Sequence, residues 1–381
     1  MDYSLKLPHK VYSGENALEQ IKLLVQGKFK KAAVFTDAGV QKSGAVDIPL
    51  AQLKDSGVEI QIFNDLPAEP TCDQAQEIIE HFRGFGADLI LAIGGGSVMD
   101  VAKLASIAAT DQYSVRDLLG DPLKGKKQIY SIMIPTTAGT GAEATPNSIV
   151  SVPERELKVG IVNEEMMPDV VILDGRMIRN LPKKIAAATG VDALCHAIEC
   201  YTSNKANPFS NLFAMESMKL IFPHIVKACE DPDALEEKNK MMLAAFYGGV
   251  AIASSGTTAV HALSYPLGGK YHIAHGVSNA IMLLPVMRFN QQACQKEFEE
   301  IYDALGKKDL TDTEKKAQWI IDEIERILIQ LELPFNLSAY HVSRDDLEDL
   351  VTAGMEVQRL LVNNKRTVTA EDAKQIYLAV L

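Results

Sequence analysis

Four of the eight histidines lie in two short windows, one of which also carries an aspartate at helical spacing. Asp192 and His196 are four residues apart, so a helix would place both side chains on one face, one turn apart. His261 and His275 lie in a second window of small and apolar residues. Three imidazoles and one carboxylate without a thiolate suit Fe²⁺ or Zn²⁺, and the ligand types do not separate these cations. The alternative is a hydrogen-bonded helix pair with two ordinary buried histidines.

The glycine-rich segment 94–97 is a candidate phosphate-binding loop. It follows a wholly apolar run and continues into a helical pattern. A helix that begins directly after a strand points unpaired backbone N–H groups at an anion. Gly95 and Gly96 would let the backbone approach a pyrophosphate, and the Ser97 hydroxyl could add a hydrogen bond. The alternative is a tight turn in which Asp100 favours the helix N-terminus.

Two further segments could contact a nucleotide. Thr136, Thr137 and Thr140 follow a strand-like run, and their hydroxyls could bind a ribose or a carboxamide. Ordinary turn chemistry is the alternative interpretation of this segment. Asp37 closes another strand-like run, where an acid can accept bonds from both hydroxyls of an adenosine ribose and would repel a 2′-phosphate. An exposed aspartate after a strand is more often a turn or N-cap residue.

Short β-branched and apolar runs alternate with helical patterns over the first 180 residues or so. Strands separated by helices predict βαβ units and a mainly parallel, Rossmann-like sheet. The run at 89–93 is almost wholly apolar, as in a central strand that is buried on both faces. The predicted strands are 32–36, 58–63, 89–93, 130–134 and 170–173. We also predict a turn and helix around 37–53 and a helix over about 73–84.

After Pro182 the strand-like alternation disappears and helical periodicity takes over. Apolar residues in 317–328 recur on a single helix face, with charged residues opposite. We therefore predict two domains, an α/β dinucleotide-binding domain over 1–181 and an all-α metal-binding, catalytic domain over 182–381.

Composition and charge restrict the class of protein. The 381 residues include 38 basic and 50 acidic side chains, a net charge of −12 that disfavours nucleic acid as a partner. No apolar run approaches the roughly 20 residues of a membrane span, and the opening segment does not resemble a signal peptide. Five cysteines without CxxC spacing indicate a reduced protein. We expect a cytoplasmic protein without a membrane or nucleic-acid partner.

Four ordered segments together resemble the iron-containing (group III) alcohol dehydrogenase family, which has the dehydroquinate-synthase-like fold. The resemblance covers essentially the whole chain. Its most specific segments are GGGSVMDVAK (94–103), PTTAGTGAE (135–143), GVDALCHAIECY (190–201) and VHALSYPLGGKYHIAHGVSNA (260–280). The resemblance implies an α/β domain followed by a helical domain, and a homodimer or larger homo-oligomer.

The resemblance also implies roles for individual residues. It implies NAD(H) as cofactor and one divalent metal, Fe²⁺ before Zn²⁺, and an acid at position 37 favours NAD over NADP. Asn147 and Ile252 match substrate-pocket positions. The metal ligands fall on Asp192, His196, His261 and His275. The dinucleotide-binding positions fall on Asp37, Gly96, Ser97, Asp100, Thr136, Thr137, Thr140 and Lys158.

The chain departs from the family pattern at three places, one of which is Ile252, where some relatives place an aromatic residue against the substrate. Many relatives have Asn within a Pro-Asn-Pro segment, whereas this chain has Glu69, which puts one cofactor contact in doubt. Many relatives also carry a proton-relaying histidine four residues after the third metal ligand, where this chain has Tyr265. His272 lies three residues before the final ligand. Tyr265 or His272 could pass the proton, or the relay could run through cofactor ribose and water; ring packing is the alternative role of both.

The expected reaction is reversible hydride transfer between a small primary alcohol or its aldehyde and nicotinamide C4, with the metal polarising the substrate oxygen. One alternative is a reductase of a small aldehyde bearing a sulfonate or phosphonate, which Lys270 and His272 could favour. A dehydroquinate-synthase-like lyase would need several basic residues, and the two ligand windows hold only Lys270. A non-catalytic role would leave the set of ligand residues unexplained.

Overall fold

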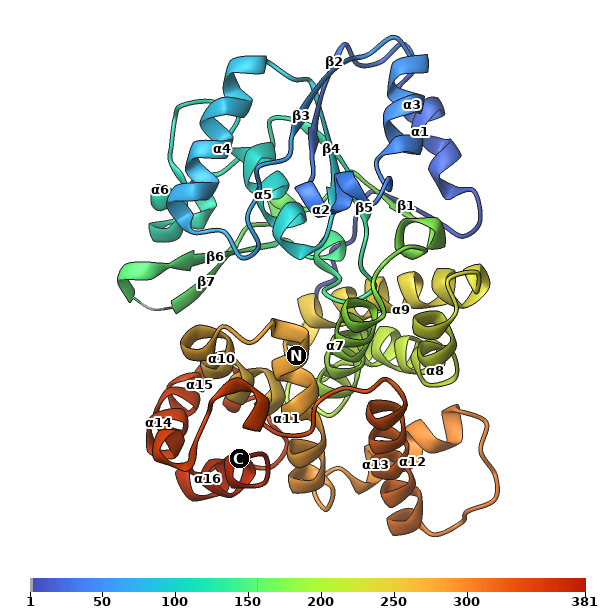
Figure 1. Ribbon diagram of the computed structural model, residues 1–381, viewed down its shortest axis with the longest axis vertical. Coiled ribbons are helices and arrows are strands. Elements are labelled where there is room, and N and C mark those ends of the chain that lie inside the picture. The colour runs from blue at the N-terminus through green and yellow to red at the C-terminus, as the bar shows by residue number, and fades with distance from the viewer. Residues whose placement is uncertain (1–2, 156) are drawn as a thin grey trace. The chain divides into compact units, whose positions relative to one another are not determined.

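The computed structural model describes residues 3–155 and 157–381, which form two compact units (Figure 1). The first, here called the α/β unit, contains Lys6–Leu181 and Pro232–Gly249. The second, here called the helical unit, contains Pro182–Asp231 and Val250–Leu381, with residues 3–5. A border between the units therefore lies at Leu181 and Pro182, and one later segment also belongs to the α/β unit.

A six-stranded sheet forms the centre of the α/β unit. All its neighbouring strands pair in parallel, in the order β1-β8-β5-β4-β2-β3, which confirms the predicted parallel sheet. Strand β4 is buried along its whole length because both faces of the sheet are covered. The strands are β1 (Lys10–Ser13), β2 (Lys31–Phe35), β3 (Glu59–Phe63), β4 (Leu89–Gly94), β5 (Tyr130–Pro135) and β8 (Val170–Leu173).

Helices cover both faces of this sheet (Figure 1). Apolar side chains of α1 and α3 pack on one face with Leu89, Leu91 and Ile93 of β4. The turn and helix predicted around 37–53 correspond to two short helices, α2 and α3, which Gly44 separates with a φ of +80°. The helices are α1 (Gln20–Val25), α2 (Ala38–Lys42), α3 (Asp47–Asp55), α4 (Cys72–Phe85), α5 (Gly96–Ile107) and α6 (Val115–Gly120).

Three strands of the α/β unit were not predicted. Strand β1 pairs with β8 at the edge of the sheet but has only four residues and no fully buried side chain. Strands β6 (Asn147–Val152) and β7 (Leu157–Val162) form a separate antiparallel pair. Polar residues in β6 conceal the apolar alternation that marks a strand.

The helical unit contains no strand among its described residues, which confirms the all-α prediction. The predicted apolar stripe 317–328 lies in α13, where its apolar side chains are buried. The helices are α7 (Lys183–Tyr201), α8 (Pro208–Glu230), α9 (Leu235–Ser255, shared by both units), α10 (Ala259–Tyr271), α11 (His275–Asn290), α12 (Gln295–Ala304), α13 (Thr313–Gln330), α14 (Leu347–Glu356), α15 (Gln358–Leu361) and α16 (Ala370–Leu378).

Helix α7 packs against α8 and α11, and α10 packs against α11 and α14. The start of α11 approaches α7 so closely that a Cβ at Gly276 would lie 2.5 Å from the Ala188 carbonyl oxygen. Glycine at this position therefore allows the two helices to meet where both histidine windows lie.

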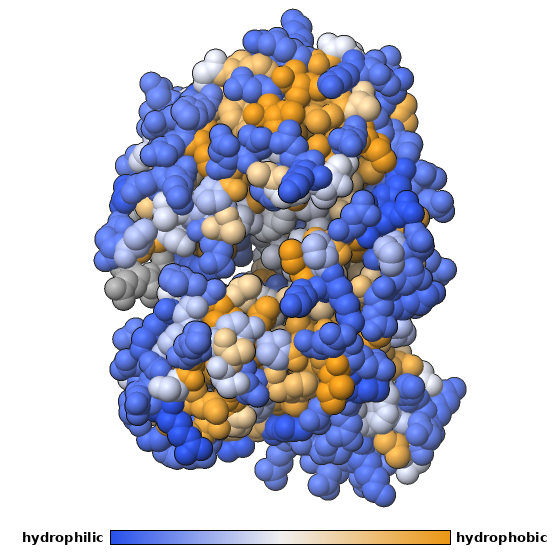
Figure 2. Space-filling model, in the orientation of Figure 1, coloured by the Kyte–Doolittle hydropathy of each residue, from blue (hydrophilic) through white to orange (hydrophobic). Residues whose placement is uncertain are grey.

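No single helix among residues 3–155 and 157–381 has the length and apolarity of a membrane span; α9 and α10 reach them only as a pair with a bend of 103°. Figure 2 shows mainly hydrophilic residues on the visible face, with apolar residues in scattered patches.

A buried charged network lies beneath the glycine-rich loop. The Lys103 side chain is fully buried, and its Nζ lies 2.9 Å from Asp100 Oδ1 and donates to the Ala142 carbonyl oxygen at 2.9 Å. Asp100 also accepts from the Ile149 N–H, which ties α5 to β6. Glu143 is buried near Lys103, and its burial raises the pKa of the carboxyl to about 7.

The raised pKa of Glu143 predicts a pH-dependent stability. An ordinary glutamate has a pKa of 4.5, so the folded chain binds this proton more tightly than the unfolded chain does. The resulting stabilisation is present below pH 4.5 and is lost as the pH rises through about 7. Glu143→Gln stays neutral, so its free energy of unfolding relative to wild type should increase from pH 5 to pH 8, by up to about 3 kcal/mol.

Thermal unfolding midpoints at the two pH values measure this difference. The matched control is Glu77→Gln, which changes an exposed glutamate on α4. A Glu143→Gln effect that is equal at pH 5 and pH 8 would contradict the assignment.

Candidate metal centre and dinucleotide site

The four histidine and aspartate residues singled out as ligands form one cluster. Helix α7 places Asp192 and His196 one turn apart, α10 supplies His261, and His275 is the first residue of α11. One ligand atom from each residue lies within 4.8 Å of the other three.

The separations in the cluster fit a tetrahedral cation. The Nε2 atoms of His196, His261 and His275 lie 3.6, 3.7 and 3.6 Å from Asp192 Oδ1. A tetrahedral ion with bonds of about 2.1 Å separates its ligand atoms by about 3.4 Å. The ligand atoms therefore need to move only slightly to hold an ion such as Fe²⁺ or Zn²⁺.

Burial sets the charge state of the cluster. Asp192, His196 and His261 are almost fully buried, whereas the His275 side chain keeps 32% of its surface exposed. Burial lowers the pKa of His196 to about 4, so its imidazole is neutral at pH 7 and can bind a cation. Burial alone would raise the pKa of Asp192, but the three imidazoles lower it below its usual value. The Nδ1 atom of His196 has no hydrogen-bond partner, which leaves the imidazole orientation to packing.

Glu199 orients His261. It lies one turn after His196 on α7 and is fully buried, and its Oε2 contacts Nδ1 of His261. Its Oε1 accepts from the Thr258 hydroxyl at 2.7 Å and the Val260 N–H at 2.8 Å. A carboxylate that accepts the Nδ1 proton leaves the Nε2 lone pair of the imidazole for a metal. The sequence analysis missed Glu199, although its spacing from Asp192 and His196 puts it on the same face of α7.

Asn279 on α11 lies against the same ligand atoms. Its Nδ2 donates to Asp192 Oδ1 at 2.7 Å and lies 3.1 and 3.2 Å from Nε2 of His261 and His275. Its Oδ1 accepts from the Ser264 hydroxyl. One of the two amide protons goes to Asp192, so the other can be donated to the Nε2 lone pair of only one of these imidazoles at a time.

The two candidates for the proton relay lie in different surroundings. The Tyr265 ring is centred 6.5 Å from the His261 ring and 6.1 Å from the His275 ring. Burial raises the pKa of Tyr265, so the phenol keeps its proton at neutral pH. His272 is exposed and caps the C-terminal end of α10 with a φ of 54°.

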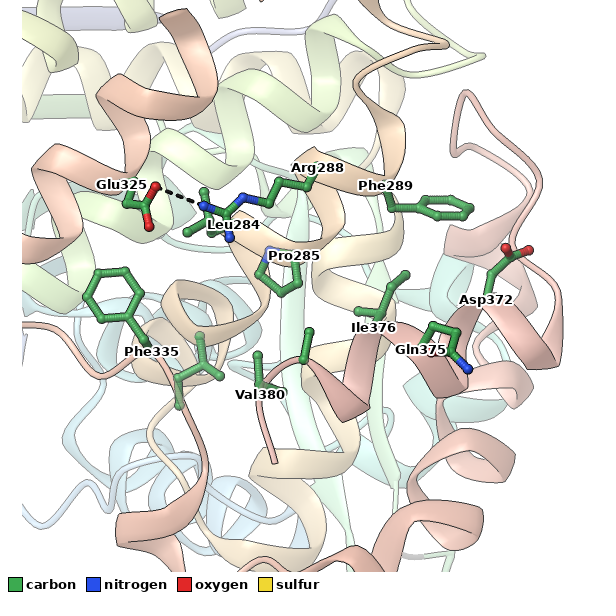
Figure 3. A pocket seen from close by; sticks show the side chains of 12 residues that line it. Leu284, Pro285, Arg288, Phe289, Glu325, Phe335, Asp372, Gln375, Ile376 and Val380 are labelled. Atoms are coloured by element: carbon green, nitrogen blue, oxygen red, sulfur yellow. Dashed lines mark hydrogen bonds and ion pairs between the residues drawn. The ribbon is translucent and has the colours of Figure 1, made fainter. Parts of the chain in front are cut away.

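The other predicted pocket positions lie in separate units. Ile252 on α9 packs against a small cluster of Cys200, Ala214 and Ala251 in the helical unit. Asn147 begins strand β6 of the α/β unit. A surface pocket of about 480 Å³ between α11, α13 and α16 contains none of the predicted site residues; the Arg288–Glu325 ion pair lies beside Leu284 and Pro285 there (Figure 3).

The glycine-rich loop and the threonine segment lie side by side in the α/β unit. Strands β4 and β5 are paired to their ends, and the Thr136 N–H donates to the Gly94 carbonyl oxygen at 2.9 Å. A Cβ on Gly95 would lie 3.6 Å from the Thr137 side chain, and one on Gly96 would lie 3.1 Å from that of Thr140. Helix α5 begins at Gly96 without a side-chain cap, so its first N–H groups face this loop.

Two predicted dinucleotide residues make contacts within the protein. Asp37 caps α2 by accepting from the Val40 N–H at 2.9 Å, as the N-cap interpretation predicted. The carboxylate of Asp100 is bound by Lys103 and the Ile149 N–H.

Glu69, the residue that departs from the family pattern, connects two other predicted positions. Its carboxylate lies 2.6 Å from Lys158 Nζ on β7, and its N–H donates to the Ser97 hydroxyl at 3.0 Å. Glu69 has a φ of +52°, an uncommon conformation for a residue with a Cβ. The charge of Lys158 is thus partly balanced beside the glycine-rich loop.

Glu199→Gln tests whether this carboxylate prepares His261 for a metal. A glutamine can donate to Nδ1, which would place the imidazole proton on Nε2 and block it as a ligand. We expect the affinity for Zn²⁺ or Fe²⁺ to fall by about 10- to 100-fold, measured by competition with a chelator. Glu314→Gln, an exposed control on α13, should bind metal like the wild type. Equal affinities in Glu199→Gln and the control would show that Glu199 only packs against His261.

Comparisons with known proteins identify the family of this chain. The model of the iron-containing alcohol dehydrogenase family matches residues 8–175, and that of its C-terminal part matches residues 186–381. Long-chain-alcohol dehydrogenase 1 of Geobacillus thermodenitrificans is 34% identical over 354 residues, which cover 92% of this chain and 89% of the relative.

Two solved structures are also similar. A 1,3-propanediol oxidoreductase has a TM-score of 0.93 at 29% identity, with all of both chains covered. A sulfoacetaldehyde reductase from Bifidobacterium kashiwanohense in complex with NAD⁺ has a TM-score of 0.89 at 26% identity, and the match covers 100% of this chain and 99% of the other. The chain belongs to the iron-containing alcohol dehydrogenase family and is an oxidoreductase.

Proposed function

We propose that this protein interconverts a small primary alcohol and its aldehyde with NAD(H), and that the helical unit holds the metal while the α/β unit binds the dinucleotide. The observation that carries the proposal is the convergence of Asp192, His196, His261 and His275 on one point. The domain roles proposed for 1–181 and 182–381 follow from where the two groups of residues lie.

We propose Fe²⁺ as the metal, with Zn²⁺ as the alternative. The three imidazoles and one carboxylate suit both cations, and the family description favours iron. A bound divalent cation supplies Lewis acidity toward the substrate oxygen. The protein contributes two buried carboxylates, Asp192 and Glu199, whose negative charges balance a divalent cation in a region of low dielectric constant.

Tyr265 is the better placed of the two candidates for proton transfer. Its ring packs beside His261 and His275, and burial raises the pKa of the phenol, so that Tyr265 carries its proton at neutral pH. His272 is exposed at the end of α10, where solvent can replace it. We therefore assign proton donation toward the substrate to Tyr265, and keep His272 as the alternative.

For the dinucleotide, we assign the N–H groups at the start of α5 to the pyrophosphate. Gly95, Gly96 and Ser97 form this turn, and the hydroxyls of Thr137 and Thr140 lie next to it. Asp37 uses one oxygen to cap α2, and its other oxygen is assigned to the adenosine ribose, which favours NAD over NADP. The NAD⁺ complex of a structural relative supports the choice of cofactor.

Two further assignments complete the proposal. The five cysteines carry no disulfide, and four of them are buried, which supports a reducing compartment such as the cytoplasm. A homodimer or larger homo-oligomer remains a prediction from the family resemblance.

A dehydroquinate-synthase-like lyase is disfavoured because Lys270, the only basic residue of the ligand windows, is paired with Asp346 and Asp349.

His261→Ala tests the proposed function. Loss of one imidazole, together with an unpaired Glu199 carboxylate, should remove bound metal and lower kcat/KM for a primary alcohol by more than about 100-fold. The dissociation constant for NADH, measured by fluorescence, should stay within about twofold, because its assigned residues lie in the other unit.

His81→Ala provides the control for His261→Ala, since His81 is exposed on α4. Full turnover by metal-free His261→Ala would overturn the proposed function.

The assignment of NAD(H) as cofactor predicts that turnover by the wild type is faster with NAD⁺ than with NADP⁺.

A further inference from the structure

Arg359 brings a positive charge to the metal-ligand cluster. It lies on the short helix α15, and its guanidinium carbon is 5.8 Å from the centre of the Tyr265 ring. The same ring is centred 6.1 Å from the His275 ring. Tyr265 therefore packs against both the guanidinium and a ligand histidine, all within the helical unit.

Arg359 forms no ion pair with any residue in the described part of the chain, and its side chain is exposed. By contrast, Arg116, Arg176 and Arg326 each bind a carboxylate within 2.8 Å. The charge of Arg359 is therefore free to bind an anion from solution. The guanidinium packs on the Tyr265 ring and interacts with its hydroxyl, and its remaining N–H donors are available for such an anion.

When a divalent cation is bound, no negative charge of the cluster is left over to balance the positive charge of Arg359. Asp192 and Glu199 supply two negative charges, which a divalent cation balances. Arg359 then adds one positive charge beside a site that already holds a cation. A neutral substrate would leave this charge without a partner, whereas an anionic substrate would provide one.

Lys270 and His272, the residues first considered for recognising an anion, are less suited to that role. Lys270 Nζ lies 3.4 Å from Asp346 Oδ1 and 3.0 Å from Asp349 Oδ2, so its charge is already balanced. His272 is exposed at the C-terminal end of α10, after Lys270. Arg359 is therefore the better candidate near the cluster.

We propose that Arg359 binds an oxyanion on the substrate, so that the preferred substrates are short alcohols and aldehydes that carry a sulfonate, phosphonate or carboxylate. This inference rests on the proposed function, because the alcohol or aldehyde oxygen must lie at the metal. The guanidinium presents two parallel N–H donors, which match two oxygens of such a group. Arg359 is in this account a specificity-determining residue, and it takes no part in the transfer of the hydride.

The first test compares an anionic and a neutral alcohol of similar size, 2-hydroxyethanesulfonate and 1-propanol. For the metal-loaded wild type, kcat/KM should be higher for the sulfonate. In Arg359→Met, the ratio of the two kcat/KM values should fall by at least about tenfold, mainly through KM, because a charge-assisted bidentate bond is lost. Arg359→Lys keeps the charge without the paired donors and should give an intermediate ratio.

A second test measures binding without turnover. Calorimetric titration of the metal-loaded protein with ethanesulfonate, methylphosphonate and acetate shows which oxyanion binds best. Arg359→Met should weaken binding of the best ligand by at least about tenfold, and added salt should weaken binding to the wild type. Arg344→Met is the matched control, since Arg344 is exposed on another turn of the helical unit.

The outcomes separate this inference from the proposed function. Efficient turnover of 1-propanol, with no preference for the sulfonate and no change of the ratio in Arg359→Met, would overturn the role of Arg359 alone. Equal effects of Arg359→Met and Arg344→Met on ethanesulfonate binding would do the same. Absence of turnover with all alcohols and aldehydes by the metal-loaded wild type would overturn the proposed function itself.

Discussion

The contact between Glu199 and His261 determines what the metal-ligand cluster can do. An imidazole can bind a cation through Nε2 only when its proton lies on Nδ1, and a buried carboxylate at Nδ1 enforces that state. Burial alone would raise the pKa of Glu199, but His261 and the bonds from Thr258 keep it below its usual value. Glu199 in turn raises the pKa of His261. The carboxylate thus prepares one ligand and contributes one of the two negative charges that a divalent cation needs.

The packing of three helices brings this contact about. Asp192, His196 and Glu199 come from α7, while their partners come from α10 and α11, more than 50 residues later. The close approach at Gly276 and the bond from Asn279 to Asp192 hold α11 against α7. In the α/β unit, β4 and β5 are paired up to their carboxyl ends, and this pairing places the glycine-rich loop beside the threonine segment.

Most of the fold could be predicted from the sequence where a segment carries one strong pattern. The apolar run of β4 and the one-sided stripe of α13 each match a single element, and both were predicted. Strand β1 was missed because it is short and half-buried, and β6 because polar residues interrupt its alternation. The break between α2 and α3 depends on the backbone conformation of Gly44, which the helical pattern does not reveal.

The metal ligands of the candidate site could be predicted from the sequence, whereas the residues around them could not. Two windows of histidines identified the four residues that converge, since ligand type and helical spacing are visible in the sequence. The spacing of Glu199 puts it on the ligand face of α7, but its role depends on its contact with His261, which the sequence does not reveal. Arg359 comes near the cluster only by packing against Tyr265, and no local pattern distinguishes it. The pairing of Lys270 with two acids likewise became visible only through packing.

X-ray absorption spectroscopy of the protein loaded with one equivalent of Fe²⁺ or Zn²⁺ tests the central claim most directly. The account predicts four nitrogen or oxygen neighbours at about 2.0–2.2 Å, with the outer scattering pattern of three imidazole rings. A sulfur neighbour at about 2.3 Å would instead show a cysteine thiolate at the metal, and a shell of oxygen atoms without imidazole scattering would show that the histidines do not bind it.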